Sequence, residues 1–398
     1  MRKNTGEPGR KAPASARLLR VIPAVVFAAA FVLLAYFLAQ PMEGDAPTSA
    51  SQRVFAAVRV TNVIEDNAQA DDWTEGLRLG SQLLEVEVLQ GEHKGERLVS
   101  PNYLSAYYNI DAKVGARIIV RLAEDDDGLL YVASFVNYDR GPVLVGFVVL
   151  FGIVLIVVGG KQGLKALFGL AFTLIALWFV LIPLLMRGAD PILTTIGVTA
   201  LTAGVSLAAL TGYTRKTFCA LIGCVGGVAA AGGLAALVGQ LTPLSGFNMP
   251  EAEELVLRAA DHGLTIRGLL VCGVLIASLG AVMDVAMSIA SSCNELRELN
   301  PELTMRALFR SGMNIGRDAM GTMANTLILA FVGSSLNALI LFRAYDYPSL
   351  QILNSDMMAI ELVQGIAGSI GIVLTVPMVA GVSAWVQTAG PRHQGNPA

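Results

Sequence analysis

An acidic side chain inside an apolar stretch is the residue of this sequence best suited to chemistry. Asp284 lies one helical turn from both Gly280 and Ser288 in an otherwise apolar segment. A charge at bilayer depth costs on the order of 2.5–3.5 kcal/mol on insertion scales, so it usually marks a transport path or a pair inside the protein. Asp284 is therefore a candidate charge or proton site. A structural hydrogen bond or an ion pair with Arg317 or Arg267 is the alternative.

Three other segments carry polar or small residues along one helical face. One holds Thr199 in a threonine stripe, another holds Asp318 and Asn325, and the third holds Glu361. Close helix packing is the first explanation for the threonines, and Asn325 could equally join two helices by hydrogen bonds. Asp318 and Glu361 lie nearer the ends of their segments, which favours solvated positions for both. The transport-path candidates are thus Asp284, Asn325, Glu361, Asp318, Thr199 and Ser288.

Side chains for enzymatic chemistry are not grouped in this sequence. His93, His262 and His393 fall in distant segments, which predicts neither a metal site nor a catalytic triad. The four cysteines lie in or beside apolar stretches, where packing is their usual role. We therefore expect no catalytic residue, metal or cofactor. The net charge of −3 gives no indication of nucleic-acid binding.

The elements that position these residues are long apolar segments. Of the 398 residues, 54% are hydrophobic and only 15% are charged. A helix needs about 20 mostly apolar residues to cross a bilayer, because lipid offers backbone groups no partner. The sequence predicts an α-helical polytopic membrane protein with about eight transmembrane helices: Leu18–Leu38, Pro142–Gly159, Ala166–Leu185, Ile192–Leu210, Phe218–Val238, Leu269–Ala290, Met320–Phe342 and Ala359–Trp385.

Basic residues predict how these spans are oriented. Short loops rich in Lys and Arg stay on the cytoplasmic side. With the N-terminus inside, the cytoplasmic segments hold fifteen Lys and Arg and the short outer loops hold four. We therefore expect both termini in the cytoplasm. A cleaved signal peptide is the weaker alternative for the first segment, because Phe37-Leu38-Ala39 is a poor cleavage site.

This orientation divides the chain into five parts. We expect a cytoplasmic basic tail (1–17), an uncleaved transmembrane signal anchor (18–41), an extracytoplasmic domain (42–141), a seven-helix transmembrane domain (142–387) and a cytoplasmic tail (388–398).

The outer part has the pattern of a small β domain. Five stretches of strand length alternate or run apolar, with turn residues between them, and predict a small OB-like β-barrel. Its hairpin tips are expected at 91–95 and 126–128, which contain glycine. The acidic run at 124–127 lacks the alternate spacing of a calcium loop, so a solvated turn is favoured there. The predicted strands are Val54–Ile64, Leu83–Leu89, Glu96–Ser100, Ala116–Leu122 and Leu129–Val136.

Three stretches of the helical part resemble the YibE/F family of bacterial multi-pass membrane proteins. They are GAVMDVAMSIASS from Gly280, GRDAMGTMANTLIL from Gly316 and GIAGSIG from Gly365, and LLEVEVLQGEHKGE from Leu83 is similar as well. The similarity covers nearly everything from Val54 to Trp385. It implies the joined layout of anchor, outer β domain and helix block in a bacterial cell (inner) membrane. It implies no established activity, so function has to be argued from the residues.

Two classes of function remain open at this point. The first is a transporter or channel for an ion or small solute, with Asp284 as its charge or proton site. The second is a non-transporting subunit or scaffold of an envelope complex, for which a short amphipathic helix within Asn300–Arg317 offers a docking surface. Membrane lipid is a partner in both cases. A second copy of the chain or an envelope protein is an expected partner as well.

The predicted orientation is testable by cysteine labelling. In a variant without native cysteines, a cysteine at Glu92 should react with a membrane-impermeant maleimide added to intact cells, because 42–141 is predicted to lie outside. A cysteine at Arg306 should react only after the cells are permeabilised. The reverse pattern would overturn the orientation of every span.

Overall fold

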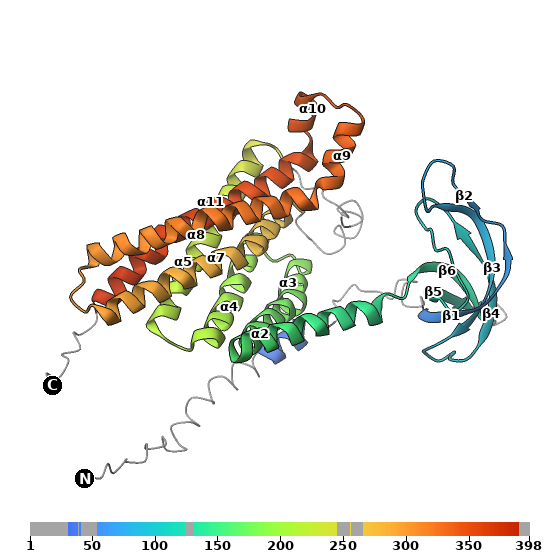
Figure 1. The fold of residues 1–398 in the computed structure, drawn as a ribbon, viewed down its shortest axis with the longest axis horizontal. Coiled ribbons are helices and arrows are strands. Elements are labelled where there is room, and N and C mark those ends of the chain that lie inside the picture. The colour runs from blue at the N-terminus through green and yellow to red at the C-terminus, as the bar shows by residue number, and fades with distance from the viewer. Residues whose placement is uncertain are drawn as a thin grey trace, which may run out of the picture. The chain divides into compact units, whose positions relative to one another are not determined.

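The computed structural model describes residues 31–38, 40, 54–124, 130–244, 255 and 266–389. The predicted basic tail (1–17), the predicted anchor before residue 31, the hairpin tip at 126–128, His262 and residues 390–398 of the C-terminal tail lie outside this part of the chain. The chain divides into two compact units, Pro41–Val154 and the remainder, Met1–Gln40 with Leu155–Ala398. Strands make up most of the first unit and helices the second (Figure 1).

The β unit is a curved antiparallel sheet. Its strand order is β2-β3-β1-β5-β6, and β4 pairs with the other edge of β3. The sheet bends so that β4 approaches β6, where the Ser100 hydroxyl donates to the Val132 carbonyl at 3.3 Å. The strands are β1 (Val54–Asp66), β2 (Gln69–Ala70), β3 (Arg78–Val88), β4 (Arg97–Leu104), β5 (Arg117–Glu124) and β6 (Leu130–Tyr138).

Alternation of apolar residues explains the core of this unit. Alternate side chains of β1, β3 and β5 point to one face, where Val58, Leu84, Val86 and Ile118 are fully buried. The five predicted strands correspond to β1, β3, β4, β5 and β6. Both glycines of the predicted tip at 91–95 have positive φ. The two-residue strand β2 was not predicted.

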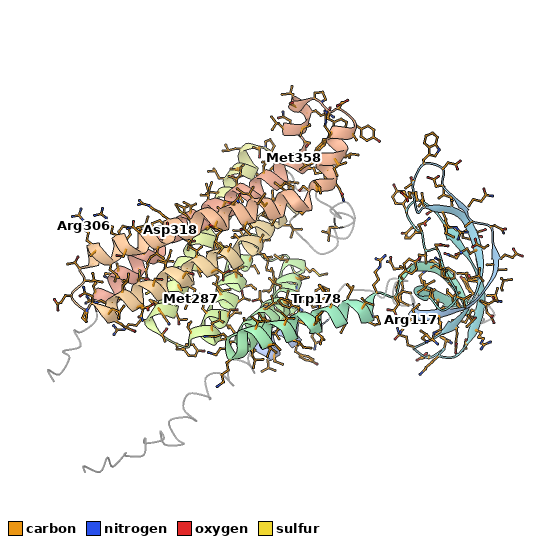
Figure 2. All side chains as sticks on the ribbon, viewed as in Figure 1. Arg117, Trp178, Met287, Arg306, Asp318 and Met358 are labelled. Carbon is orange, nitrogen blue, oxygen red and sulfur yellow. The ribbon has the colours of Figure 1, made fainter. Side chains whose placement is uncertain are left out.

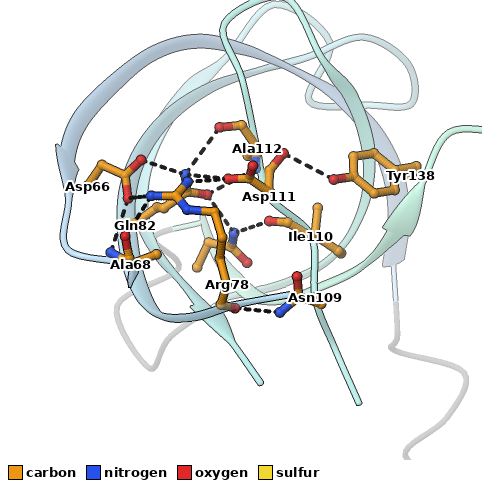
Figure 3. A network of polar contacts seen from close by, with 10 residues as sticks. Asp66, Ala68, Arg78, Gln82, Asn109, Ile110, Asp111, Ala112 and Tyr138 are labelled. Atoms are coloured by element: carbon orange, nitrogen blue, oxygen red, sulfur yellow. Dashed lines mark hydrogen bonds and ion pairs between the residues drawn. The ribbon is translucent and has the colours of Figure 1, made fainter. Parts of the chain in front are cut away.

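A network of polar side chains lies at one end of the β unit (Figure 3). Gln82 is almost fully buried at its centre. Its amide donates to the Asp66 and Asp111 carboxylates at 3.2 and 3.3 Å, and its carbonyl accepts from the Ala112 N–H at 3.0 Å. Arg78 bridges the same two carboxylates, at 2.9 and 2.5 Å. The network joins β3 to the segments that follow β1 and precede β5.

Hydrogen bonding within this network changes the acidity of Asp66. Burial raises the pKa of the carboxyl, but hydrogen bonds from the Ala68 N–H, Gln82 and Arg78 outweigh it and hold the pKa below its ordinary value of 3.8. A carboxyl with a depressed folded pKa stabilises the fold above its unfolded pKa. That stabilisation is lost as the pH falls through the folded pKa.

The helical unit begins with a chain reversal. The helix α2 is interrupted at Gly160, whose φ of 54° and ψ of −131° lie outside the helical region. A Cβ on Gly163 would overlap the Leu155 carbonyl oxygen. Residues eight apart in a straight helix are about 12 Å apart, so the two halves of α2 must fold against each other at this point.

Side-chain caps start several of the following helices. Asp190, Thr214, Thr304 and Ser355 each accept a hydrogen bond from the backbone N–H three residues later. The elements are α2 (Gly141–Ala176), the π-helix η2 (Leu177–Leu181), α3 (Ile182–Met186), α4 (Pro191–Thr211), α5 (Arg215–Leu241), α7 (Ile266–Leu299), α8 (Met305–Ser334), α9 (Leu336–Ala344), α10 (Ser349–Leu353) and α11 (Asp356–Thr388). The prediction of a separate short helix within Asn300–Arg317 is wrong, because α8 runs without interruption from Met305 to Ser334.

Within the described residues, five helical segments are long and apolar enough to cross a membrane. The pair α8 and α9, bent by 56°, makes a sixth if it is one span. The predicted spans Pro142–Gly159 and Ala166–Leu185 both fall in the first of these segments, and most of Leu18–Leu38 is not described. The five segments are Gly141–Met186, Pro191–Thr211, Arg215–Leu241, Gly268–Leu299 and Asp356–Thr388.

An arginine joins the N-terminal helix to the rest of the helical unit. Residues 31–38 are helical, and Arg187 at the end of α3 donates to the carbonyls of Phe37, Leu38 and Gln40 at 3.0–3.3 Å. Its guanidinium also lies 5.6 Å from the Phe37 ring centroid. Free carbonyls at a helix C-terminus attract a cation, so Arg187 caps this helix. Leu38 is buried in the same cluster as Leu181 of η2.

The buried Gln82 network predicts a stability effect. Expressed alone, residues 51–138 should fold and unfold cooperatively with a β-type circular dichroism spectrum. Gln82→Leu should lower the free energy of unfolding in urea by about 1–3 kcal/mol, because it removes the partner of the Ala112 N–H and one of the two acceptors of the Asn102 amide. Stability should also fall as the pH is lowered towards 3, since the Asp66 contribution is then lost.

The exposed Gln69 on β2 provides a matched control. Gln69→Leu should leave the urea midpoint almost unchanged. An equal loss of stability in the two variants would show that the network contributes nothing specific.

Candidate functional site

The sequence-predicted residue Asp284 lies on the exposed face of α7. The opposite face is apolar and packs into the core of the unit through Val282, Val285 and Ile289. One turn on either side of Asp284, Gly280 and Ser288 are exposed as well. The exposed face of α7 therefore carries a carboxylate between two small residues, where large apolar side chains would be expected for contact with lipid.

The alternative pairing of Asp284 with arginine finds no support in the part of the chain that is described. No ion pair joins Asp284 to Arg317, which is exposed on α8. The side chain of Arg267 is not among those described. Asp284 accepts no hydrogen bond from a described side chain either. The Asp284 carboxylate can therefore contact water, take up a proton or bind another molecule.

A second exposed polar face lies on α8. Asp318 and Asn325 are both exposed there, two turns apart, together with Thr322. Figure 2 shows Asp318 on this helix and Arg306 near its N-terminal end. No hydrogen bond among the described residues joins Asn325 to a neighbouring helix. The interpretation of Asn325 as a link between helices is thus not supported by a contact here.

The threonine stripe of α4 is buried and internally bonded. Thr199 is almost fully buried, and its hydroxyl donates to the carbonyls of Thr195 and Ile196 at 2.7 and 3.0 Å. Thr195 contacts the Cys272 thiol of α7 at 3.0 Å. These hydroxyls already have partners within the helix bundle. Thr199 is therefore mainly a packing residue, as was expected from the sequence for the threonine stripe.

Glu361 is half-buried near the start of α11 and differs from the other candidates. Its Oε2 atom is inaccessible to solvent and has no hydrogen-bond partner among the described residues. It borders a small cavity against the end of α8 and α9. No hydrogen bond or ion pair between described side chains joins any two of the six predicted residues.

Comparison with known proteins identifies the family. The family model of the YibE/F-like proteins matches residues 147–389, which is more than half of the chain. The chain belongs to the YibE/F-like family. No curated protein and no solved structure matches it. The family match and the apolar helices together indicate a membrane location for this YibE/F-like protein.

The matched region is organised around α11, which contacts α5, α7 and α8. Small residues bring these helices close together. A Cβ on Gly371 of α11 would lie 2.7 Å from the Ala231 Cβ and 2.9 Å from the Gly227 carbonyl oxygen of α5. The glycine pair Gly223 and Gly227, predicted as a packing motif, faces Val379 and Thr375 of α11. This packing fixes the helix that carries Glu361.

The break between α8 and α9 was not predicted from the sequence, because Met320–Phe342 was predicted to be a single span. The helix breaks at Ser335, between α8 and α9. The run Gly333-Ser334-Ser335 is a signal that could have located the break, because Gly and Ser pairs are common at sharp helix kinks.

The contact of Gly371 with α5 predicts a stability effect. Gly371→Ala should lower the thermal stability of the detergent-solubilised protein, by an amount equivalent to about 1–3 kcal/mol, because the added methyl group has no room. Gly233 on α5 has nothing within 4 Å of a built Cβ and is the matched control. Gly233→Ala should leave the melting temperature unchanged or slightly raise it. Equal melting temperatures for the two variants would contradict the close approach of α5 and α11.

Proposed function

We propose that this YibE/F-like protein moves an ion or a small solute across the membrane, with Asp284 as a charge or proton site. The observation that carries the proposal is the exposed Asp284 carboxylate between Gly280 and Ser288 on α7, with no ion pair to a described side chain. A charge facing lipid tails is costly, so this face of α7 needs water, a proton or a bound solute beside it. Each of these can change during a transport cycle.

The proposed path is bordered by four spans. They are the helices that carry Thr199, Asp284, Asn325 and Glu361, with Ser288 and Asp318 on the same exposed faces of α7 and α8. Thr199 contributes by packing, and the exposed residues contribute polarity. The bent pair α8 and α9 fits this proposal, because broken helices in transporters expose backbone groups to the transported species.

We also propose the layout in which this path works. Eight spans place both termini in the cytoplasm of a bacterial cell and the β unit outside its inner membrane. The reversal at Gly160 supports two spans within Gly141–Met186. The Arg187 cap supports an anchor that is retained, because it joins Leu38 to the end of α3, which the orientation also places outside. The strand order and the approach of β4 to β6 support an OB-like barrel.

A non-transporting subunit or scaffold of an envelope complex is the second candidate. The same exposed polar faces of α7 and α8 support it, since a second copy of the chain or an envelope protein would also cover Asp284 and Asn325. Purification without cross-linking separates the two functions. A stoichiometric partner protein together with no solute flux by the chain alone would favour the scaffold.

The transport proposal is tested by Asp284→Asn, which keeps the size of the side chain and removes its charge. In liposomes that contain the purified protein, flux over a panel of ions and small solutes should fall at least about tenfold, because one charge-stabilising interaction is worth about 1.5–3 kcal/mol. Expression and melting temperature should stay near wild type.

Asp346→Asn, in the exposed loop after α9, is the charge-matched control and should keep full flux. Full activity of Asp284→Asn would mean that the path lies elsewhere. A loss of activity explained entirely by failed assembly would make Asp284 a structural residue.

A further inference from the structure

The break between α8 and α9 encloses a cavity against α11. The helix turns by 56° at Ser335, and Leu336 starts α9. Beside the break lies a cavity of about 120 Å³. Met358, labelled in Figure 2 near the start of α11, is one of the residues that line the cavity. Its walls are almost entirely apolar and include Ile328, Phe331, Val332, Leu339, Leu362 and Ile366.

One carboxylate borders this apolar space. Glu361 is the only ionisable residue among the described residues that line the cavity. Its Oε2 atom is buried and accepts no hydrogen bond from them. A buried anionic oxygen without a donor is unfavourable, so a positively charged hydrogen-bond donor beside Glu361 would be stabilised there.

The Ser335 hydroxyl provides a second polar group. It donates to the Phe331 carbonyl at 3.0 Å, which leaves its oxygen lone pairs free to accept a hydrogen bond. Ser335 is itself almost fully buried. Glu361 and Ser335 thus both line the cavity, while nearly all of its accessible surface is hydrocarbon. Because the Oε2 atom is itself inaccessible, a bound donor requires the Glu361 side chain to rotate until its unpartnered oxygen points into the cavity.

We propose that this cavity binds a small alkylammonium ion, with the ammonium group on Glu361 and Ser335 and the alkyl chain against Phe331, Val332 and Leu362. A primary ammonium has three N–H donors, which match the two acceptors and leave one for water. The size fits as well, because an apolar protein cavity of about 150 Å³ holds one benzene molecule. A hard metal ion fits poorly, since such ions take about six or more oxygen ligands.

This inference builds on the proposed function by naming a class of solute, but it concerns binding alone. Glu361 lies on α11 and Asp284 on α7, and no hydrogen bond or ion pair joins them in the described part of the chain. Binding without a gradient can therefore be tested separately from flux. Asp284→Asn should abolish flux and leave binding of the amine intact.

The test is calorimetric titration of the full-length protein in detergent with n-propylammonium chloride. Wild type should bind it, and the neutral isostere propan-1-ol should bind at least about tenfold more weakly, because a charge-assisted hydrogen bond is worth about 1.5–3 kcal/mol. Glu361→Gln should lose at least about tenfold in affinity for the amine. Glu302→Gln, in the exposed loop between α7 and α8, is the matched control and should bind as wild type.

A second variant fills the cavity and keeps the carboxylate. A Cβ on Gly365 would lie 3.7 Å from the Phe331 ring, so Gly365→Val should block the amine without removing Glu361. Unchanged melting temperatures show that both variants are folded.

Three results would overturn the proposal. The first is no binding of the amine to folded wild type. The second is equal binding of the amine and propan-1-ol with no effect of Glu361→Gln, which would make the cavity a general apolar pocket that lipid can fill. The third is displacement of the amine by sodium at the same concentration, which would make it an inorganic cation site.

Discussion

The structure of the helical unit depends on one constraint: polar groups that lie in hydrocarbon must find partners within the protein. Backbone groups meet it through the helices. Most buried hydroxyls meet it by bonding to a carbonyl one turn earlier in their own helix, as Thr199 does to Thr195 and Thr375 does to Gly371. Among the described residues, the carboxylates of Asp284, Asp318 and Glu361 and the buried hydroxyl of Ser383 have no hydrogen-bond partner. Of these, Glu361 combines a carboxylate with a buried oxygen atom.

Close helix packing follows from the same constraint. Once hydroxyls bond within their own helices, little polar attraction is left between helices, and association depends on contact area. Small residues on α5 and α11 allow the backbones themselves to touch, and α8 uses Gly312 and Gly316 in the same way against Ala380 and Val376. The helix α11 becomes the rigid centre of the unit. The polar faces of α7 and α8 remain exposed on the outside of the helical unit.

Periodicity in the sequence predicted the elements well because burial acts on local patterns. Alternation located β1 and β3–β6 to within a few residues, and the apolar runs located α4, α5, α7 and α11. The gap between the predicted spans Pro142–Gly159 and Ala166–Leu185 located the chain reversal at Gly160. The break at Ser335 was not predicted, because it depends on what a neighbouring segment allows. The candidate site was predicted as a set of polar residues. Which of them are exposed, as Asp284 is, and which are buried, as Thr199 is, depends on how whole helices rotate against each other, and that is not encoded within one helix.

The Arg187 cap has a consequence for how the protein is made. The carbonyls at the end of the helix over residues 31–38 are capped by Arg187, about 150 residues further along the chain. At a synthesis rate of about 5–20 residues per second, that side chain leaves the ribosome about 8–30 seconds later. The whole β unit is synthesised in this interval. Arg187 therefore cannot cap the helix over residues 31–38 until the β unit has been synthesised, and this contact is a late step in the assembly of the helical unit.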